Sequence, residues 1–220
     1  MSRDQNKNRE YFLKYLGEQD KRIKRFTEVL HSLEDQKPEK AVQCKHMLVN
    51  MLKDAISASY SVGETYEQIS VRISKYLSTL NEVKITDYRE MIDALAFGIL
   101  FPNHNLENIM QTEMFDDALV CQMKDYILKG TYSKQDAIVK FPEQYQVFYK
   151  YLNGDICVAE FLEYMENKWY DTCKESAFYD THKNANEVYV GYWCWVAAAV
   201  LKMTSQQSCH SKYIPSEVIR

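Results

Sequence analysis

The residues best suited to chemistry lie between positions 173 and 183. In the run Asp180-Thr181-His182-Lys183 a carboxylate precedes an imidazole by two residues, and Cys173 lies nine positions before that histidine. Such a set could serve a small hydrolase, with Cys173 as the nucleophile and Asp180 orienting His182. No Gly-rich phosphate loop, G-x-S-x-G or H-E-x-x-H motif accompanies it. We therefore predict that Asp180 and His182 fix a long loop by hydrogen bonds, and that the protein is not an enzyme.

The cysteines offer a second kind of chemistry, which is metal binding. They number six, with no C-x-x-C pair and no regular spacing, at positions 44, 121, 157, 173, 194 and 209. This pattern is typical neither of a disulfide framework nor of a zinc site, so we predict reduced, mostly buried thiols. A metal site would require Cys173, His182, Cys209 and His210 to converge, which their spacing does not support. We predict no metal and no cofactor.

An acidic stretch is the third candidate, and it suits binding. From Glu143 to Asp180 there are eight acidic side chains against three basic ones, whereas the first 110 residues carry sixteen of each. A basic protein could dock on such a surface, while direct binding of nucleic acid is disfavoured. A merely solvated face is the alternative. The candidate binding residues are Glu143, Asp155, Glu160, Glu163 and Glu166.

The composition predicts the elements that must position these residues. Hydrophobic residues make up 46% of the 220. The six Gly and four Pro are too few to form the turns of many hairpins, so we expect an all-α protein. Apolar residues recur at helical spacing over 11–33, 38–60, 66–80, 91–101, 106–127, 145–152 and 155–169. Ser133 could cap a further short helix before Phe141-Pro142.

The organisation expected from these helices is a multi-helix bundle of two packed halves. Pro102-Asn103-His104-Asn105 combines a helix stop with capping residues, so we place the boundary there and expect domains at 1–101 and 102–220. No apolar run is long enough to span a bilayer, and the N-terminus is polar, which predicts a cytoplasmic protein without a membrane partner. The sequence does not indicate the oligomeric state.

The run from Tyr189 to Met203 is the most informative stretch of the chain for packing. Two Tyr and two Trp precede three consecutive Ala, Ala197-Ala198-Ala199. Large aromatic rings need covering by partners, and small residues let neighbouring helices approach closely. We therefore predict a buried central helix here, around which the C-terminal half assembles, with residues 174–188 as the loop leading into it.

Three segments together resemble a known family. Trp169-Tyr170, then Tyr179-Asp180-Thr181-His182-Lys183, then the run from Tyr189 through Val200 with Lys202, are similar to the C-terminal signature of the PoNi immunity proteins. Those protect bacteria from PoNe-type nuclease toxins. The signature residues to which the resemblance gives a structural role are Trp169, Asp180, His182, Lys183, Gly191, Tyr192 and Trp193. The first half resembles the family's N-terminal domain in its helical pattern.

The resemblance implies a two-part, all-α protein without catalysis. Such a protein would bind its cognate toxin, the DNase domain of a secreted polymorphic toxin, and occlude the active or DNA-binding surface. The chain departs from the pattern at Val196, where similar members often carry an acidic residue. A helical adaptor or dimerisation module unrelated to toxins is the remaining alternative.

Overall fold

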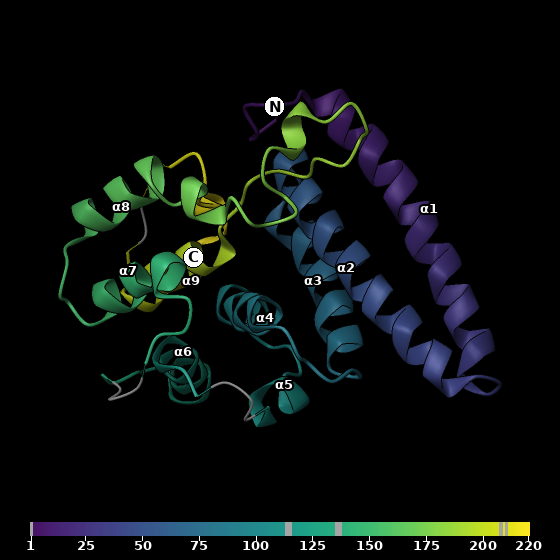
Figure 1. The fold of residues 1–220 in the computed structure, drawn as a ribbon, viewed down its shortest axis with the longest axis horizontal. Helices are drawn as coiled ribbons and strands as arrows, with labels where there is room; N and C mark the ends of the chain where they lie inside the picture. The colour runs from purple at the N-terminus through teal and green to yellow at the C-terminus, as the bar shows by residue number, and fades with distance from the viewer. Residues whose placement is uncertain (1, 113–115, 135–137, 207–208, 210) are drawn as a thin grey trace. The chain divides into compact units, whose positions relative to one another are not determined.

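A computed structural model of the chain describes residues 2–112, 116–134, 138–206, 209 and 211–220. These residues divide into two compact units (Figure 1). Unit 1 comprises the chain up to Lys84 together with His104–Asn108 and Asp180–Tyr192. Unit 2 comprises Ile85–Asn103, Ile109–Tyr179 and Trp193–Arg220. The regular elements of the described residues are all helical, which confirms the all-α prediction.

Unit 1 is built on three long helices, α1 (Arg9–Glu34), α2 (Pro38–Val62) and α3 (Tyr66–Leu80). Both α1 and α3 pack against α2 (Figure 1). Their ends follow local chemistry. Pro38 occupies the first turn of α2, and Gly63 ends that helix in the left-handed conformation with φ 93°. Thr65 and Gln68 then form a reciprocal capping box that starts α3.

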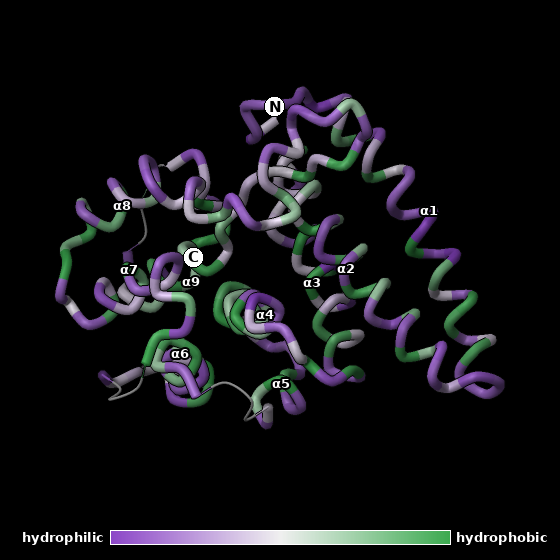
Figure 2. The backbone as a smooth tube through the Cα atoms, in the orientation of Figure 1, coloured by the Kyte–Doolittle hydropathy of each residue, from purple (hydrophilic) through white to green (hydrophobic). Residues whose placement is uncertain are grey.

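Unit 2 contains the remaining longer helices. They are α4 (Tyr88–Leu100), α6 (Ala118–Lys129), α7 (Pro142–Leu152), α8 (Val158–Asn167) and α9 (Trp195–Met203), with short 3-10 turns η1 (Tyr170–Cys173) and η3 (Ser216–Val218). The short α5 (Glu107–Gln111) precedes α6 in the chain. Helix α4 packs against α6 and α9, while α7 packs against α6, α8 and α9. Apolar residues fill most of α4 (Figure 2), and this helix forms much of the core of unit 2.

Helix α9 is buried as predicted, but it begins later than the sequence suggested. Ala197, Ala198 and Ala199 are fully buried, and Trp195 packs on Phe97 of α4 with ring centroids 5.2 Å apart. Residues 189–194, however, are not helical. Gly191 has φ 109°, which a right-handed helix does not allow. The prediction that the helix starts with the aromatic run is therefore wrong: Tyr189, Tyr192 and Trp193 precede the helix, and of the four aromatics Trp195 alone lies in it.

Two other helix predictions also need correction. The helix expected over 106–127 is divided into α5, which ends at Gln111, and α6, whose N-terminus is capped by the Asp117 side chain. The helix expected from Asp155 begins only at Val158. Of the expected positions, Met114 and much of the short helix after Ser133 lie outside the described residues. In the part of the chain that the structure describes, no helix has both the length and the apolarity to cross a bilayer.

Candidate functional site

Cys173, the nucleophile of the hydrolase alternative, lies in η1 of unit 2 and is buried. Its Sγ donates to the carbonyl oxygen of Trp169 at 3.5 Å. Burial raises the pKa of this thiol. A buried, protonated thiol that donates to a backbone carbonyl is a poor nucleophile, because the thiolate is the reactive form.

The loop residues Asp180 and His182 belong to unit 1. The Nδ1 atom of His182 lies 2.7 Å from the hydroxyl of Tyr192, and the same hydroxyl accepts a hydrogen bond from the backbone N–H of His182 at 3.1 Å. Asp180 accepts a hydrogen bond from Lys183 Nζ at 2.7 Å and adopts the left-handed conformation with φ 57°. These bonds shape η2 (Thr181–Lys183) and hold it against Tyr192.

The aromatic part of the signature anchors the same segment on the N-terminus of unit 1. Tyr189 is 1% exposed, and its hydroxyl donates to the Asp4 carboxylate and accepts from Asn6 Nδ2. The Tyr11 hydroxyl accepts from the backbone N–H of Tyr189 and donates to its carbonyl, both at 3.0 Å. The Tyr189 ring meets that of Tyr192 edge-on at 4.8 Å. Segment 180–192 is thus fastened to residues more than 170 positions earlier in the chain.

The other signature aromatics lie in unit 2. Trp169 is buried, with ring centroids 5.1 Å from Tyr213 and 6.4 Å from Phe178. Trp193 is half-buried just before α9. Trp169 therefore holds η1 and the C-terminal tail together, while the signature residues between 180 and 192 stabilise unit 1.

The five acidic candidates lie on α7, on α8 and in the loop between them, but they are not equivalent. Glu160 Oε2 accepts from the backbone N–H of Cys157 at 2.8 Å and so caps the start of α8. This bond holds the pKa of Glu160 below its usual value. Glu166 pairs with Lys212 Nζ at 3.1 Å and accepts from Ser211 Oγ. These two carboxylates therefore have structural partners already.

The other three are more available to a partner. Glu143 and Glu163 are exposed, and Asp155 makes a long ion pair with Lys134 at 3.7 Å. By sequence, unit 2 carries sixteen acidic and eleven basic side chains, whereas unit 1 carries fifteen and sixteen. The net negative charge of the protein is thus concentrated in the unit that contains α7 and α8.

The metal alternative receives no support from the residues that the structure describes. No group of three or more His, Cys, Asp or Glu side chains among them could hold an ion. Cys209 is buried, and His210 lies outside the described residues.

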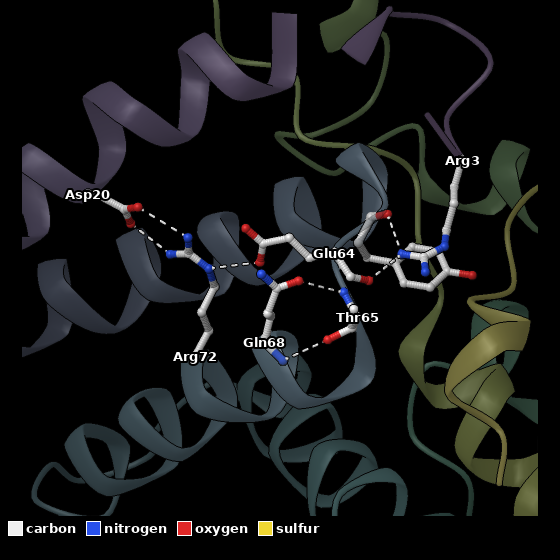
Figure 3. Close-up of polar contacts among 7 residues, drawn as sticks. Arg3, Asp20, Glu64, Thr65, Gln68 and Arg72 are labelled. Carbon is white, nitrogen blue, oxygen red and sulfur yellow. Dashed lines mark hydrogen bonds and ion pairs between the residues drawn. The ribbon is translucent and has the colours of Figure 1, made fainter. Parts of the chain in front are cut away.

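A groove that the sequence did not indicate lies in unit 1. It encloses about 720 Å³, between residues of α1 and α3, with Leu52 of α2 also in its lining. At one end Arg72 of α3 makes a bidentate bond to Asp20 of α1, at 2.7 and 3.1 Å, and its Nε lies 3.4 Å from Glu64 (Figure 3). Asp20 and Arg72 are 52 residues apart, so helical periodicity could not have paired them.

Replacing Arg72 by Met is expected to lower the free energy of unfolding by about 1 kcal/mol, because a bidentate pair linking two helices is lost while the stem is kept. Urea denaturation would measure the change. Lys75→Met, at an exposed groove position one turn further along α3, is the matched control and should change the free energy of unfolding by less than about 0.5 kcal/mol. Equal effects of the two substitutions would contradict the role given to the Arg72 pair.

Comparison with known proteins yields two matches that together span most of the chain. Residues 3–112 match the model described as PoNe immunity protein (PoNi), N-terminal, and residues 115–212 match PoNe immunity proteins (PoNi), C-terminal. No curated protein and no solved structure matches the chain. Both matching models describe immunity proteins, which are not enzymes, so the hydrolase alternative is set aside. With both family domains present and in order, the chain belongs to the PoNi family of PoNe immunity proteins.

Proposed function

We propose that this protein binds its cognate PoNe toxin, a DNase, and neutralises it by covering the toxin's active or DNA-binding surface. The observation that carries the proposal is the match of both halves of the chain to PoNe immunity proteins. The acidic charge of unit 2 supports the same proposal. A nuclease presents a basic surface to DNA, and an acidic partner can occupy such a surface in place of the phosphates.

We assign the toxin-binding surface to unit 2, on the exposed side of α7 and α8. The exposed negative charge comes from Glu143, Asp155 and Glu163. The helix α8 itself is stabilised by the cap that Glu160 makes and by the ion pair of Glu166 with Lys212. Exposed charges at the rim of an interface mainly accelerate encounter and select the partner. This surface would therefore steer the toxin into place rather than supply most of the affinity.

Co-expression with the cognate PoNe toxin tests the proposal. Cells that produce the toxin should grow only when the immunity protein is present, and the two proteins should co-purify. A catalytically inactive toxin is the control, since it should co-purify without arresting growth in the first place. Failure to rescue growth, together with the absence of a complex, would rule out the proposed function.

Reversing charge on the assigned surface gives a sharper measurement. For Glu143→Lys/Glu163→Lys we expect the association rate with the toxin to fall by about tenfold at low salt and to depend less on ionic strength. Stopped-flow mixing at several salt concentrations would measure both. The control is Asp35→Lys/Glu39→Lys, which makes the same charge change at two exposed positions in unit 1. An equal fall in the association rate of both double variants would mean that the net charge of the protein, rather than this surface, directs the encounter with the toxin.

A further inference from the structure

The backbone just before α7 is in an unusual conformation. Four non-glycine residues of the described chain have positive φ, namely Asn103, Phe141, Asp180 and Ser205. Asn and Asp tolerate the left-handed region because their short side chains can bond locally, but a bulky aromatic there is a clear outlier. Phe141 adopts φ 52° and ψ 59°. Strain of this kind persists only where the surroundings impose it, and it is concentrated at functional positions.

The surroundings of Phe141 impose the turn from both sides. On the N-terminal side, the backbone N–H of Lys140 donates to the buried Asp117 carboxylate, and the N–H of Ala118 donates to the carbonyl of Ile138 at 3.1 Å. On the C-terminal side, the Phe141 carbonyl accepts from the N–H groups of Gln144 and Tyr145, each at 3.0 Å. The turn is therefore fixed by the ends of α6 and α7.

The side chain of Phe141 contacts the core at one edge but remains largely outside it. It is 54% exposed, and its ring centroid lies 5.2 Å from that of the buried Tyr88. From Tyr88 a chain of ring contacts leads through Tyr145 and Phe148 to Phe161, with centroids 5.4 to 5.8 Å apart. One edge of the ring thus rests on the aromatic core of unit 2, and the rest faces solvent.

Two apolar residues close to Phe141 in the sequence are also exposed. Ile138 is 81% exposed and Pro142 is also exposed, so three apolar residues within five positions face solvent at this turn. Glu143, one of the residues assigned to toxin steering, follows directly. Exposed apolar patches flanked by polar residues are characteristic of protein–protein contacts, whose affinity is concentrated in a few rigid aromatic anchors.

We propose that Phe141 is the principal anchor of the toxin interface and inserts into an apolar pocket beside the basic DNA-binding surface of the nuclease. This inference rests on the proposed function. The occupant is the toxin because unit 2 has five more acidic than basic side chains, which complements a basic nuclease and disfavours a second copy of this acidic unit. Because the turn fixes the backbone of Phe141 and the ring already rests on Tyr88, less conformational freedom is lost on binding than for an unrestrained side chain.

Phe141→Gly separates this role from a role in folding. Glycine adopts the left-handed conformation readily, so the backbone strain is relieved while the anchor is removed. We expect the dissociation constant for the inactive toxin to rise by at least about 30-fold, with a melting temperature that is unchanged or higher. Phe141→Tyr should stay within about threefold of the original affinity, because it keeps the ring.

The control is Leu128→Ala, which removes an apolar side chain from the end of α6 that is 69% exposed and so more exposed than Phe141. The affinity of this variant for the inactive toxin should be the same as that of the unaltered protein. Calorimetric titration of each variant would decide the matter. Unchanged affinity in Phe141→Gly overturns the inference, as does a lower melting temperature without loss of affinity, which would make Phe141 a packing residue. A dimer of the free protein that Phe141→Gly disrupts, with toxin affinity intact, also overturns it. If the unaltered protein binds no toxin, the proposed function itself fails.

Discussion

Replacing Tyr189 by Ala is expected to lower the free energy of unfolding by about 3–5 kcal/mol, the range found for deletion of a buried aromatic side chain. The ring is 1% exposed and contacts the rings of Phe12 and Tyr192. Its loss also leaves Asp4 and Asn6 without the hydroxyl that they share. A change of this size is a large part of the stability of an ordinary domain.

Tyr189→Phe is the matched control, because it removes only the hydroxyl. We expect it to cost about 1–2 kcal/mol, since the Asp4 carboxylate then loses one half-buried hydrogen bond. Urea denaturation followed by circular dichroism would measure both variants. A loss below 1 kcal/mol for Tyr189→Ala would contradict the fastening of segment 180–192 to the N-terminus of unit 1.

The long helices were predictable because their signals are local. Apolar spacing predicted α1 to α4, and the residues that end or cap them act within a turn of the chain. Asp87, for instance, accepts from the N–H groups of Arg89 and Glu90 at the start of α4, which is the usual role of an aspartate at a helix N-cap. Gly63 and Thr65 mark the boundary between α2 and α3 in the same way.

The aromatic run at 189–194 was not predictable in this way, because its conformation depends on distant partners. The Tyr11 hydroxyl accepts a hydrogen bond from the N–H of Tyr189 and donates one to its carbonyl. Ser61 Oγ donates to the carbonyl of Val190 at 2.8 Å. These contacts with α1 and α2 satisfy the backbone groups that a helix would otherwise pair, and the positive φ of Gly191 then follows. The pattern of apolar residues predicted burial correctly but could not distinguish a helix from an extended segment.

The candidate site was also only partly accessible to sequence reasoning. Composition located the acidic stretch, and helical spacing put Glu160, Glu163 and Glu166 on one helix, α8. The sequence alone could not show that Glu160 caps this helix, or that Glu166 pairs with Lys212, 46 residues later. The turn at Phe141 gave no signal at all, since a bulky residue such as Phe is rarely found in that conformation.

Asp117→Ala is expected to lower the free energy of unfolding by about 2–4 kcal/mol, an effect second only to that of Tyr189→Ala among the substitutions proposed here. The carboxylate is fully buried and serves two elements at once. Its Oδ1 accepts from the N–H of Val120 at 2.9 Å, capping α6, while its Oδ2 accepts from the N–H of Lys140. Alanine leaves the buried N–H of Val120 and the half-buried N–H of Lys140 without this acceptor, and an unsatisfied buried group costs about 1–3 kcal/mol.

The neighbouring Asp116 provides a control that differs in position by a single residue. It is exposed, so Asp116→Ala should change the free energy of unfolding by less than about 0.5 kcal/mol. Asp117→Asn should fall between the two, because an amide keeps one acceptor oxygen but turns a donor toward either Val120 or Lys140. Amide hydrogen exchange at those two residues should accelerate in Asp117→Ala. Equal stability of the two alanine variants would contradict the buried double cap, and with it the fixed turn that presents Phe141.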